Sequence, residues 1–232
     1  GSLWWGSAGL HRRLGGGAWS AYTAREGLPG DVVWAVLRDR GQRLWVATNS
    51  GAAELTATGF RRVPGTEGRD LRTIAQASDG RLLLAGRIGA EVLALDLRDD
   101  RLTVLPFAGI DPSARVLRLQ VDRSEALWAA TSDGLYRADA AAQPQFARVT
   151  AAGPVPEGPA IDVREDAAGR LWVAGRLGLW VRDGGRWSRF GSADGLRRDF
   201  VSHVLPTSSG ELFVGYGDPL GVAHARYAEG RL

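Results

Sequence analysis

The chain carries one short apolar pattern six times. The pattern is a Leu followed by a large apolar residue and two smaller ones, as in Leu44 to Ala47. Trp4 and Phe213 hold the same position in the first and last copies and are 209 residues apart. The repeat is therefore about 42 residues long. Periods of ~40–50 residues occur in β-propellers and in some helical solenoids. Each copy is short and is bounded by turn residues such as Gly41 and Gly51, which leaves no room for a helix. The repeat therefore predicts an all-β fold, a β-propeller.

The best-formed repeat begins at Gly27 and predicts four successive strands, as in a propeller blade. The first ends before Asp39, and the others cover residues 44–48, 52–55 and 60–63. The same order recurs along a single propeller domain, in repeats at about 1–31, 32–71, 72–115, 116–159, 160–200 and 201–232. The first repeat lacks its innermost strand and the last lacks its outermost one. We therefore expect 22 strands in four-stranded antiparallel blades, about five and a half blades, as an open arc or as part of a larger seven-bladed ring.

Composition excludes several classes of function. The 232 residues contain no Cys, so disulfides and thiolate chemistry are absent, and all 29 basic residues are Arg. The net charge is only +3, and no basic run exceeds two residues, whereas nucleic-acid binding needs a clustered basic face. No apolar stretch reaches about 18 residues, so we expect no membrane segment in this chain. Because no Met occurs even at position 1, we expect an excised or processed piece, and the origin of Gly1 and Ser2 stays open.

Three tryptophans share one position in the second strand of their repeats: Trp45, Trp128 and Trp172. A tryptophan that buries ~150–250 Å² contributes strongly to packing. We interpret these three as packing residues between blades, and we do not expect them to stack on a ligand. Trp180 and Trp187 stay without an assigned role.

Several segments resemble the repeats of the two-component regulator propeller family. They are residues 27–33, 41–48, 134–136 and 187–201. The family pattern is roughly G-L-x-x-x-x-V, then D-x-x-G-x-L-W-[IV]-[GA]-T, then G-[LI]-[YF], and the chain departs from it at Leu83, where Leu replaces the Trp. In this family the propellers form the extracytoplasmic sensor regions of hybrid histidine kinases and diguanylate cyclases. The resemblance implies a periplasmic sensor fragment with no cofactor and no catalytic residues.

A ligand site is expected where the turns between the second and third strands meet the connections between blades. These loops lie around the channel mouth, and propeller function usually lies on such loops. Two of these turns share the sequence Ala-Gly-Arg, and their arginines are Arg87 and Arg176. Guanidinium groups bind carboxylate or sulfate in a bidentate way, so an anionic oligosaccharide or another small anion is the expected ligand. The candidate ligand-binding residues are Arg87, Arg176, Asn49, Asp133, Tyr216, Asp31 and Asp199, with Tyr216 stacking on a sugar ring.

The alternative for these residues is that the arginines only pair with nearby acids such as Asp31, Asp133 and Asp199. A competing function is a secreted propeller lyase of the streptogramin-lyase type, which would use His, Glu and a metal. Only His11, His203 and His224 occur, without metal-ligand spacing, so we expect neither a metal site nor an enzyme.

A third function is a platform that binds other proteins. Its partners would be the remaining blades or neighbouring domains of the same receptor, or a second copy in a homodimer. Composition does not separate this function from ligand sensing. The ligand, the output domain, the closure of the ring and the oligomeric state are left open by the sequence.

Overall fold

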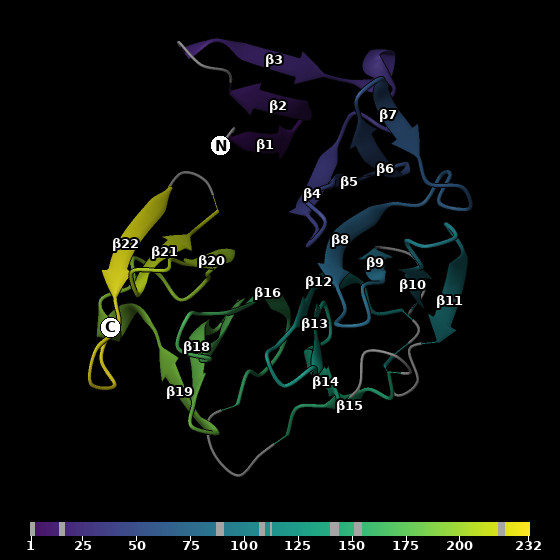
Figure 1. Ribbon diagram of the computed structural model, residues 1–232. Helices are drawn as coiled ribbons and strands as arrows, with labels where there is room; N and C mark the ends of the chain where they lie inside the picture. Colours follow the sequence, from purple (N-terminus) through teal and green to yellow (C-terminus); the bar gives the residue numbers. More distant parts are fainter. Residues whose placement is uncertain are drawn as a thin grey trace. The chain divides into compact units, whose positions relative to one another are not determined.

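The computed structural model describes residues 3–13, 17–86, 91–106, 110–111, 113–139, 144–150, 155–217 and 221–232. Within these residues the chain forms 22 strands in six antiparallel sheets, shown in Figure 1. The chain divides into two compact units, residues 1–106 and 107–232. Arg87 lies outside the described residues.

The first unit contains three sheets. The first sheet consists of β1 (Trp4–Ser7), β2 (Gly9–Arg13) and β3 (Trp19–Tyr22). The second consists of β4 (Val33–Arg38), β5 (Leu44–Thr48), β6 (Gly51–Thr56) and β7 (Gly59–Arg62). The third consists of β8 (Leu71–Gln76), β9 (Leu82–Gly86), β10 (Glu91–Leu95) and β11 (Leu102–Pro106).

The second unit also contains three sheets. The first consists of β12 (Val116–Val121), β13 (Leu127–Thr131), β14 (Leu135–Ala138) and β15 (Ala147–Arg148). The second consists of β16 (Ala160–Glu165), β17 (Leu171–Gly175), β18 (Gly178–Asp183) and β19 (Arg186–Phe190). The third consists of β20 (His203–Pro206), β21 (Glu211–Gly215) and β22 (Val222–Arg226).

Every sheet is a meander in which each strand pairs with the next one along the chain, as in the blades of the expected β-propeller. The expected four-stranded blades and the two three-stranded ones are confirmed. The expected strand at 44–48 has the observed bounds Leu44–Thr48. The outer strand β15 is short, because only Ala147–Arg148 pairs with β14 while Phe146 is buried.

Blades within a unit pack through their first strands and their buried second strands. In the second unit β12 contacts β16, and β16 contacts β20. The second strands are mostly apolar because a sheet lies against each face, as in β5 and β17, where every residue is buried. Trp45, Trp128 and Trp172 are 1%, 2% and 0% exposed, which confirms their expected packing role.

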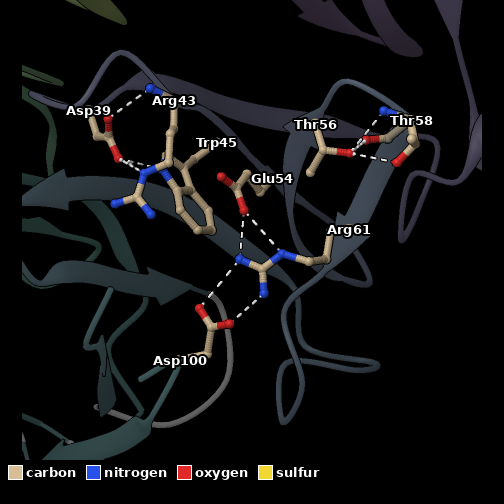
Figure 2. Close-up of polar contacts among 9 residues, drawn as sticks. Asp39, Arg43, Trp45, Glu54, Thr56, Thr58, Arg61 and Asp100 are labelled. Carbon is tan, nitrogen blue, oxygen red and sulfur yellow. Dashed lines mark hydrogen bonds and ion pairs between the residues drawn. The ribbon is translucent and has the colours of Figure 1, made fainter. Parts of the chain in front are cut away.

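Each of these three tryptophans is held by an aspartate from the end of the preceding strand. In the second sheet Trp45 Nε1 donates to Asp39 Oδ2 at 3.0 Å, and Arg43 donates to the same carboxylate through Nε at 2.8 Å (Figure 2). Burial raises the pKa of Asp39, but the hydrogen bonds from Trp45 and Arg43 outweigh it and hold this pKa below its usual value. The aspartate thus satisfies a buried indole N–H and orders the turn between two strands.

Two short 3-10 turns precede the first strands of two blades, at Ala24–Glu26 and Ser192–Asp194. The repeat pattern does not predict them. No described segment forms a helix with the length and apolarity needed to cross a membrane.

Candidate functional site

A buried aspartate joins the first strands of the second unit. Asp162 on β16 is 1% exposed. Its Oδ1 accepts hydrogen bonds from Arg118 Nε at 2.9 Å and from Val163 N at 3.1 Å. Its Oδ2 accepts one from Val204 N at 3.2 Å. Because Arg118 lies on β12 and Val204 on β20, one carboxylate links three successive blades.

A second guanidinium group lies against the same carboxylate. Arg164 Nε is 3.4 Å from Asp162 Oδ1, and the side chain of Arg164 is half-buried. Arg118 and Arg164 are both permanently charged, so two cations share one anion. We call Arg118, Asp162, Arg164 and His203 the Asp162 cluster, and it has an excess of positive charge.

His203 on β20 is the titratable member of this cluster. Its Nδ1 is 3.1 Å from Ser202 Oγ. The loss of hydration beside the neighbouring strands lowers the pKa of His203 below its usual value, the charge of Asp162 opposes this shift, and the charges of Arg118 and Arg164 add to it. His203 therefore gains its proton at a lower pH than an ordinary histidine does.

Arg176 lies at the same end of its sheet as the cluster. Asp162 pairs across the sheet with Ala174, and Arg176 follows two residues later in the turn between β17 and β18. Its side chain is exposed and makes no hydrogen bond or ion pair with a described residue. Arg176 is therefore available to an anion.

A surface hollow of about 260 Å³ lies beside this turn. Arg189 lies at its rim and donates through Nε to the carbonyl oxygen of Leu177. Leu177 is 47% exposed, whereas Trp180, which the sequence analysis left without a role, is buried beneath it. The hollow is lined by Val155, Glu157, Leu177, Trp180 and Arg189. A partly apolar hollow, lined also by Glu157 and Arg189, thus lies next to the turn that carries Arg176.

Two of the expected ligand residues hold loops in place. Asp31 Oδ1 accepts a hydrogen bond from Ala24 N at 2.7 Å, and Asp199 Oδ1 accepts one from Ser192 N at 2.7 Å. These bonds fix the two 3-10 turns in equivalent repeats. The hydrogen bonds with Ser192 hold the pKa of Asp199 below its usual value. Asp199 also lies 3.8 Å from Arg189 Nη2, at the rim of the hollow.

Asn49 and Asp133 are also engaged within their turns. Asn49 Oδ1 accepts a hydrogen bond from Val32 N at 3.2 Å. The carboxylate of Asp133 accepts one from the hydroxyl of Tyr136 and lies 3.4 Å from Arg148 Nη1. Burial and the bond to Asp133 raise the pKa of Tyr136 to about 12. Both side chains therefore shape the loops rather than stand free.

Tyr216 does not offer a stacking surface. The residue is 7% exposed and packs in the apolar core of the last two sheets, and its hydroxyl accepts a hydrogen bond from Arg197 N at 3.2 Å. The expected sugar-stacking role of Tyr216 therefore does not fit its burial. Arg87 lies outside the described residues, so its position relative to Arg176 stays a prediction.

Sequence analysis missed the Asp162 cluster. Arg118, Asp162 and His203 hold the same register position in three successive first strands, opposite Ala130, Ala174 and Gly215. A charged or titratable residue at one position of consecutive repeats is a signal that an alignment of the repeats with one another could have found. The described residues contain no group of three His, Asp or Glu side chains that could hold a metal ion.

A comparison with protein-family models matches residues 27–50 to "Two component regulator propeller". No curated protein matches the chain.

Three solved structures with different functions share the fold. The first, the extracellular domain assigned to a hybrid two component system of B. thetaiotaomicron, is 20% identical, with a TM-score of 0.75 over 97% of this chain and 32% of that one. PorZ, a surface component of the type-IX secretion system of Porphyromonas gingivalis, is 17% identical, with a TM-score of 0.73 over 97% of this chain and 37% of that one. Virginiamycin B lyase from Staphylococcus aureus is 10% identical, with a TM-score of 0.73 over 98% of this chain and 81% of that one.

This chain spans about a third of the length of the first two structures. Identities this low show a common fold and not a common function. The match at residues 27–50 confirms the resemblance to the two-component regulator propeller family, and the structural likeness confirms the β-propeller fold over nearly the whole chain.

Proposed function

We propose that this chain is a non-catalytic, ligand-binding propeller module from the extracytoplasmic sensor region of a bacterial signalling receptor. The family match at residues 27–50 and the likeness to an extracellular domain of a hybrid two component system support this proposal. The periplasm is the proposed location. The remaining blades or neighbouring domains of the receptor are its proposed partners, with a homodimer as a further possibility.

The proposed ligand is a small anion, such as an acidic oligosaccharide, bound at the end of the second unit that carries the Asp162 cluster. The observation that carries this proposal is the sharing of one buried carboxylate, Asp162, by Arg118 and Arg164. Their remaining N–H donors suit a second carboxylate, and Arg176 adds a free guanidinium at the same end of the sheet.

Binding of an anion beside the Asp162 cluster would change the contacts between blades. Asp162 joins β12, β16 and β20 through Arg118 and Val204. An anion that draws Arg118 or Arg164 toward itself weakens these links, because each guanidinium has a limited number of donors. A shift of one blade against the next is the proposed first step of signalling.

Calorimetric titration with trigalacturonate tests the proposal, with the neutral maltotriose as the uncharged counterpart. We expect trigalacturonate to bind and maltotriose not to bind. Arg176→Gln should weaken binding about tenfold, since it removes one charge-assisted contact. Arg186→Gln is the matched control, because Arg186 is also exposed and lies at the opposite end of the same sheet. Equal affinity in both variants would contradict the proposed site.

His203 gives the lyase alternative a specific basis. It lies on a first strand among charged groups, and a histidine-to-alanine variant of virginiamycin B lyase is described as catalytically inactive. Incubation with quinupristin, followed by mass spectrometry, tests this alternative. We expect the antibiotic to stay intact. Conversion that His203→Ala abolishes would establish the lyase function in place of the sensor function.

A further inference from the structure

Four blades place a tryptophan of the second strand beneath the outer strands, next to the following blade. These residues are Trp4, Trp45, Trp128 and Trp172. Other side chains have to cover the outer face of each indole ring, here called the groove above the ring, because an indole face exposed to water loses much of its packing energy. The four grooves differ in what occupies them.

An ion-pair bridge spans the groove above Trp45. Glu54 lies opposite Trp45 on the third strand, and Arg61 lies opposite Glu54 on the outer strand. Arg61 Nη2 is 2.6 Å from Glu54 Oε2, and Arg61 Nη1 is 2.6 Å from Asp100 Oδ2 in the next blade. Figure 2 shows this bridge running from one blade to the other beside the indole ring.

Aromatic rings fill two of the other grooves. The ring of Tyr227 meets that of Trp172 edge-on, with 5.2 Å between the ring centroids. In the first blade the ring of Tyr22 stacks on Trp4 at 6.1 Å and meets Phe60 of the next blade at 5.5 Å. Each of these fillings comes from the chain itself.

The groove above Trp128 has no residues equivalent to Glu54 and Arg61 of the ion-pair bridge. The residue opposite Trp128 is Arg137, where Trp45 has Glu54, and Ala147 takes the position of Arg61. The next blade contributes Gly185. A hollow of about 330 Å³ results, here called the outer hollow; its described lining includes Trp128, Trp187, Arg137, Arg148, Arg182 and Asp139.

The outer hollow combines positive charge with aromatic surface. The guanidinium carbons of Arg137 and Arg182 lie 5.5 Å and 5.8 Å from the ring centroid of Trp128, and Trp187 meets that ring edge-on at 6.4 Å. The described lining holds three arginines and one acid, Asp139. Arg137 pairs with Asp139 and Arg148 with Asp133, so Arg182 is the arginine of this lining that has no ion pair with a described residue.

The donors of the two stacked arginines are only partly used. Arg137 pairs through Nη1 with the exposed Asp139 at 2.6 Å, while its Nε is buried without a hydrogen-bond partner. Arg182 makes no ion pair with a described residue. Because a buried N–H without an acceptor costs free energy, a ligand oxygen that accepts a hydrogen bond from Arg137 Nε would be bound favourably.

We propose that the outer hollow binds a small carboxylate that carries a ring. Its carboxylate would accept hydrogen bonds from Arg137 and Arg182, and its ring would pack against the half-buried Trp187 and the guanidinium planes. The volume falls within the range of small-molecule sites, which starts near ~300 Å³. This site is separate from the Asp162 cluster, so the proposal stands independently of the proposed function.

Titration followed by tryptophan fluorescence and thermal unfolding tests this proposal. The probes are benzoate and glucuronate, which differ in the kind of ring, with acetate as the carboxylate without a ring and glucose as the ring without a charge. We expect at least one ring carboxylate to bind at least tenfold more tightly than acetate and glucose. The better of the two identifies the ring as aromatic or as a sugar. Equal binding of all four probes, or binding of none, would overturn the proposal.

Variants then locate the binding. Arg182→Gln should abolish the preferential response to the ring carboxylate, because it removes one of the two guanidinium groups that would hold the carboxylate. The matched control is Arg61→Gln, which removes an arginine from the bridged groove above Trp45. A response that survives Arg182→Gln would overturn the proposal.

A second variant keeps the test valid if Arg182→Gln unfolds. Arg137→Glu combined with Ala147→Arg rebuilds the Glu54–Arg61 pair in the outer hollow, because the two positions face each other on β14 and β15. We expect the rebuilt pair to keep the melting temperature and to eliminate ring-carboxylate binding. Retained binding in this folded variant would contradict the assignment.

Discussion

The indole nitrogen of Trp45 donates a hydrogen bond to Asp39 Oδ2 across 3.0 Å, and both residues are buried. The same pair recurs twice, as Asp122 with Trp128 at 2.7 Å and Asp166 with Trp172 at 2.9 Å. In the two repeats where the tryptophan is replaced by a residue without an N–H, the aspartate is replaced as well. Those positions hold Ala77 with Leu83, and Thr207 with Phe213. The aspartate and the tryptophan thus act as one unit.

Asp39→Ala should lower the free energy of unfolding by about 2–3 kcal/mol, because it leaves the buried indole N–H of Trp45 without an acceptor. Urea unfolding measures this loss. In a Trp45→Phe background the same substitution should cost about 1–2 kcal/mol less, since no indole N–H remains to be satisfied. An equal cost in both backgrounds would show that the two residues do not interact energetically.

Asp162→Ala should destabilise the second unit by about 3–5 kcal/mol, because it strands the charges of Arg118 and Arg164 and two backbone donors. Asp162→Asn keeps the acceptor oxygen and should recover part of this loss. Urea unfolding of both variants tests the prediction. A change below about 0.5 kcal/mol in Asp162→Ala, the size of an ordinary surface substitution, would contradict the structural role of this carboxylate.

His203 should make stability fall as the pH drops below about 6.5. Its pKa is lower in the folded protein than in the unfolded chain. The unfolded chain therefore binds the proton more tightly, so this contribution to stability is complete above the ordinary histidine pKa of about 6.5 and is lost as the pH falls. Melting temperatures at pH 7.5 and pH 5.0 measure the effect.

His203→Gln should reduce the fall in melting temperature between these two pH values. His224→Gln serves as the control, because His224 stacks on Phe213 and contacts Glu211 outside the cluster. This control variant should show the same fall in melting temperature between the two pH values as the wild type. An unchanged fall in His203→Gln would show that His203 does not carry the pH dependence.

Gly86→Ala should cost about 2–3 kcal/mol, because a Cβ at Gly86 would lie 1.8 Å from the carbonyl oxygen of Asp70 and the backbone there has to move. Gly217→Ala is the control, since among the described residues the nearest atom that a Cβ there would meet is 3.9 Å away on Phe200. The control should stay within about 0.5 kcal/mol of the wild type. Similar stability of the two variants in urea unfolding would refute the close approach at Gly86.

This close approach explains part of the Ala-Gly-Arg motif that the sequence analysis connected with a ligand. At the second copy, a Cβ on Gly175 would lie 2.8 Å from the carbonyl oxygen of Pro159. The shared glycines are therefore required by the preceding loop. The close approach of the loop does not explain the arginines that follow these glycines. Arg176 therefore stays the candidate for binding an anion.

The sequence predicts the strands well and the site poorly, for a physical reason. A strand such as Leu44–Thr48 follows from its own apolar residues and flanking turns, which are local information. The 3-10 turn at Ala24–Glu26 is capped locally by Thr23 and Glu26, and Ala24 N also donates a hydrogen bond to Asp31, which lies beyond the turn. The role of Asp162 depends on Arg118, 44 residues earlier, and on a backbone N–H 42 residues later. Only the packing of neighbouring blades brings such partners together.

The account of this chain as part of a sensor is tested most directly by sequencing the encoding gene on both sides of these 232 codons. The account predicts further propeller repeats, a membrane-spanning helix and a histidine kinase or diguanylate cyclase domain in the same reading frame. A stop codon after only one or two more blades, with a signal peptide upstream, would contradict it and would indicate a secreted lyase or binding protein.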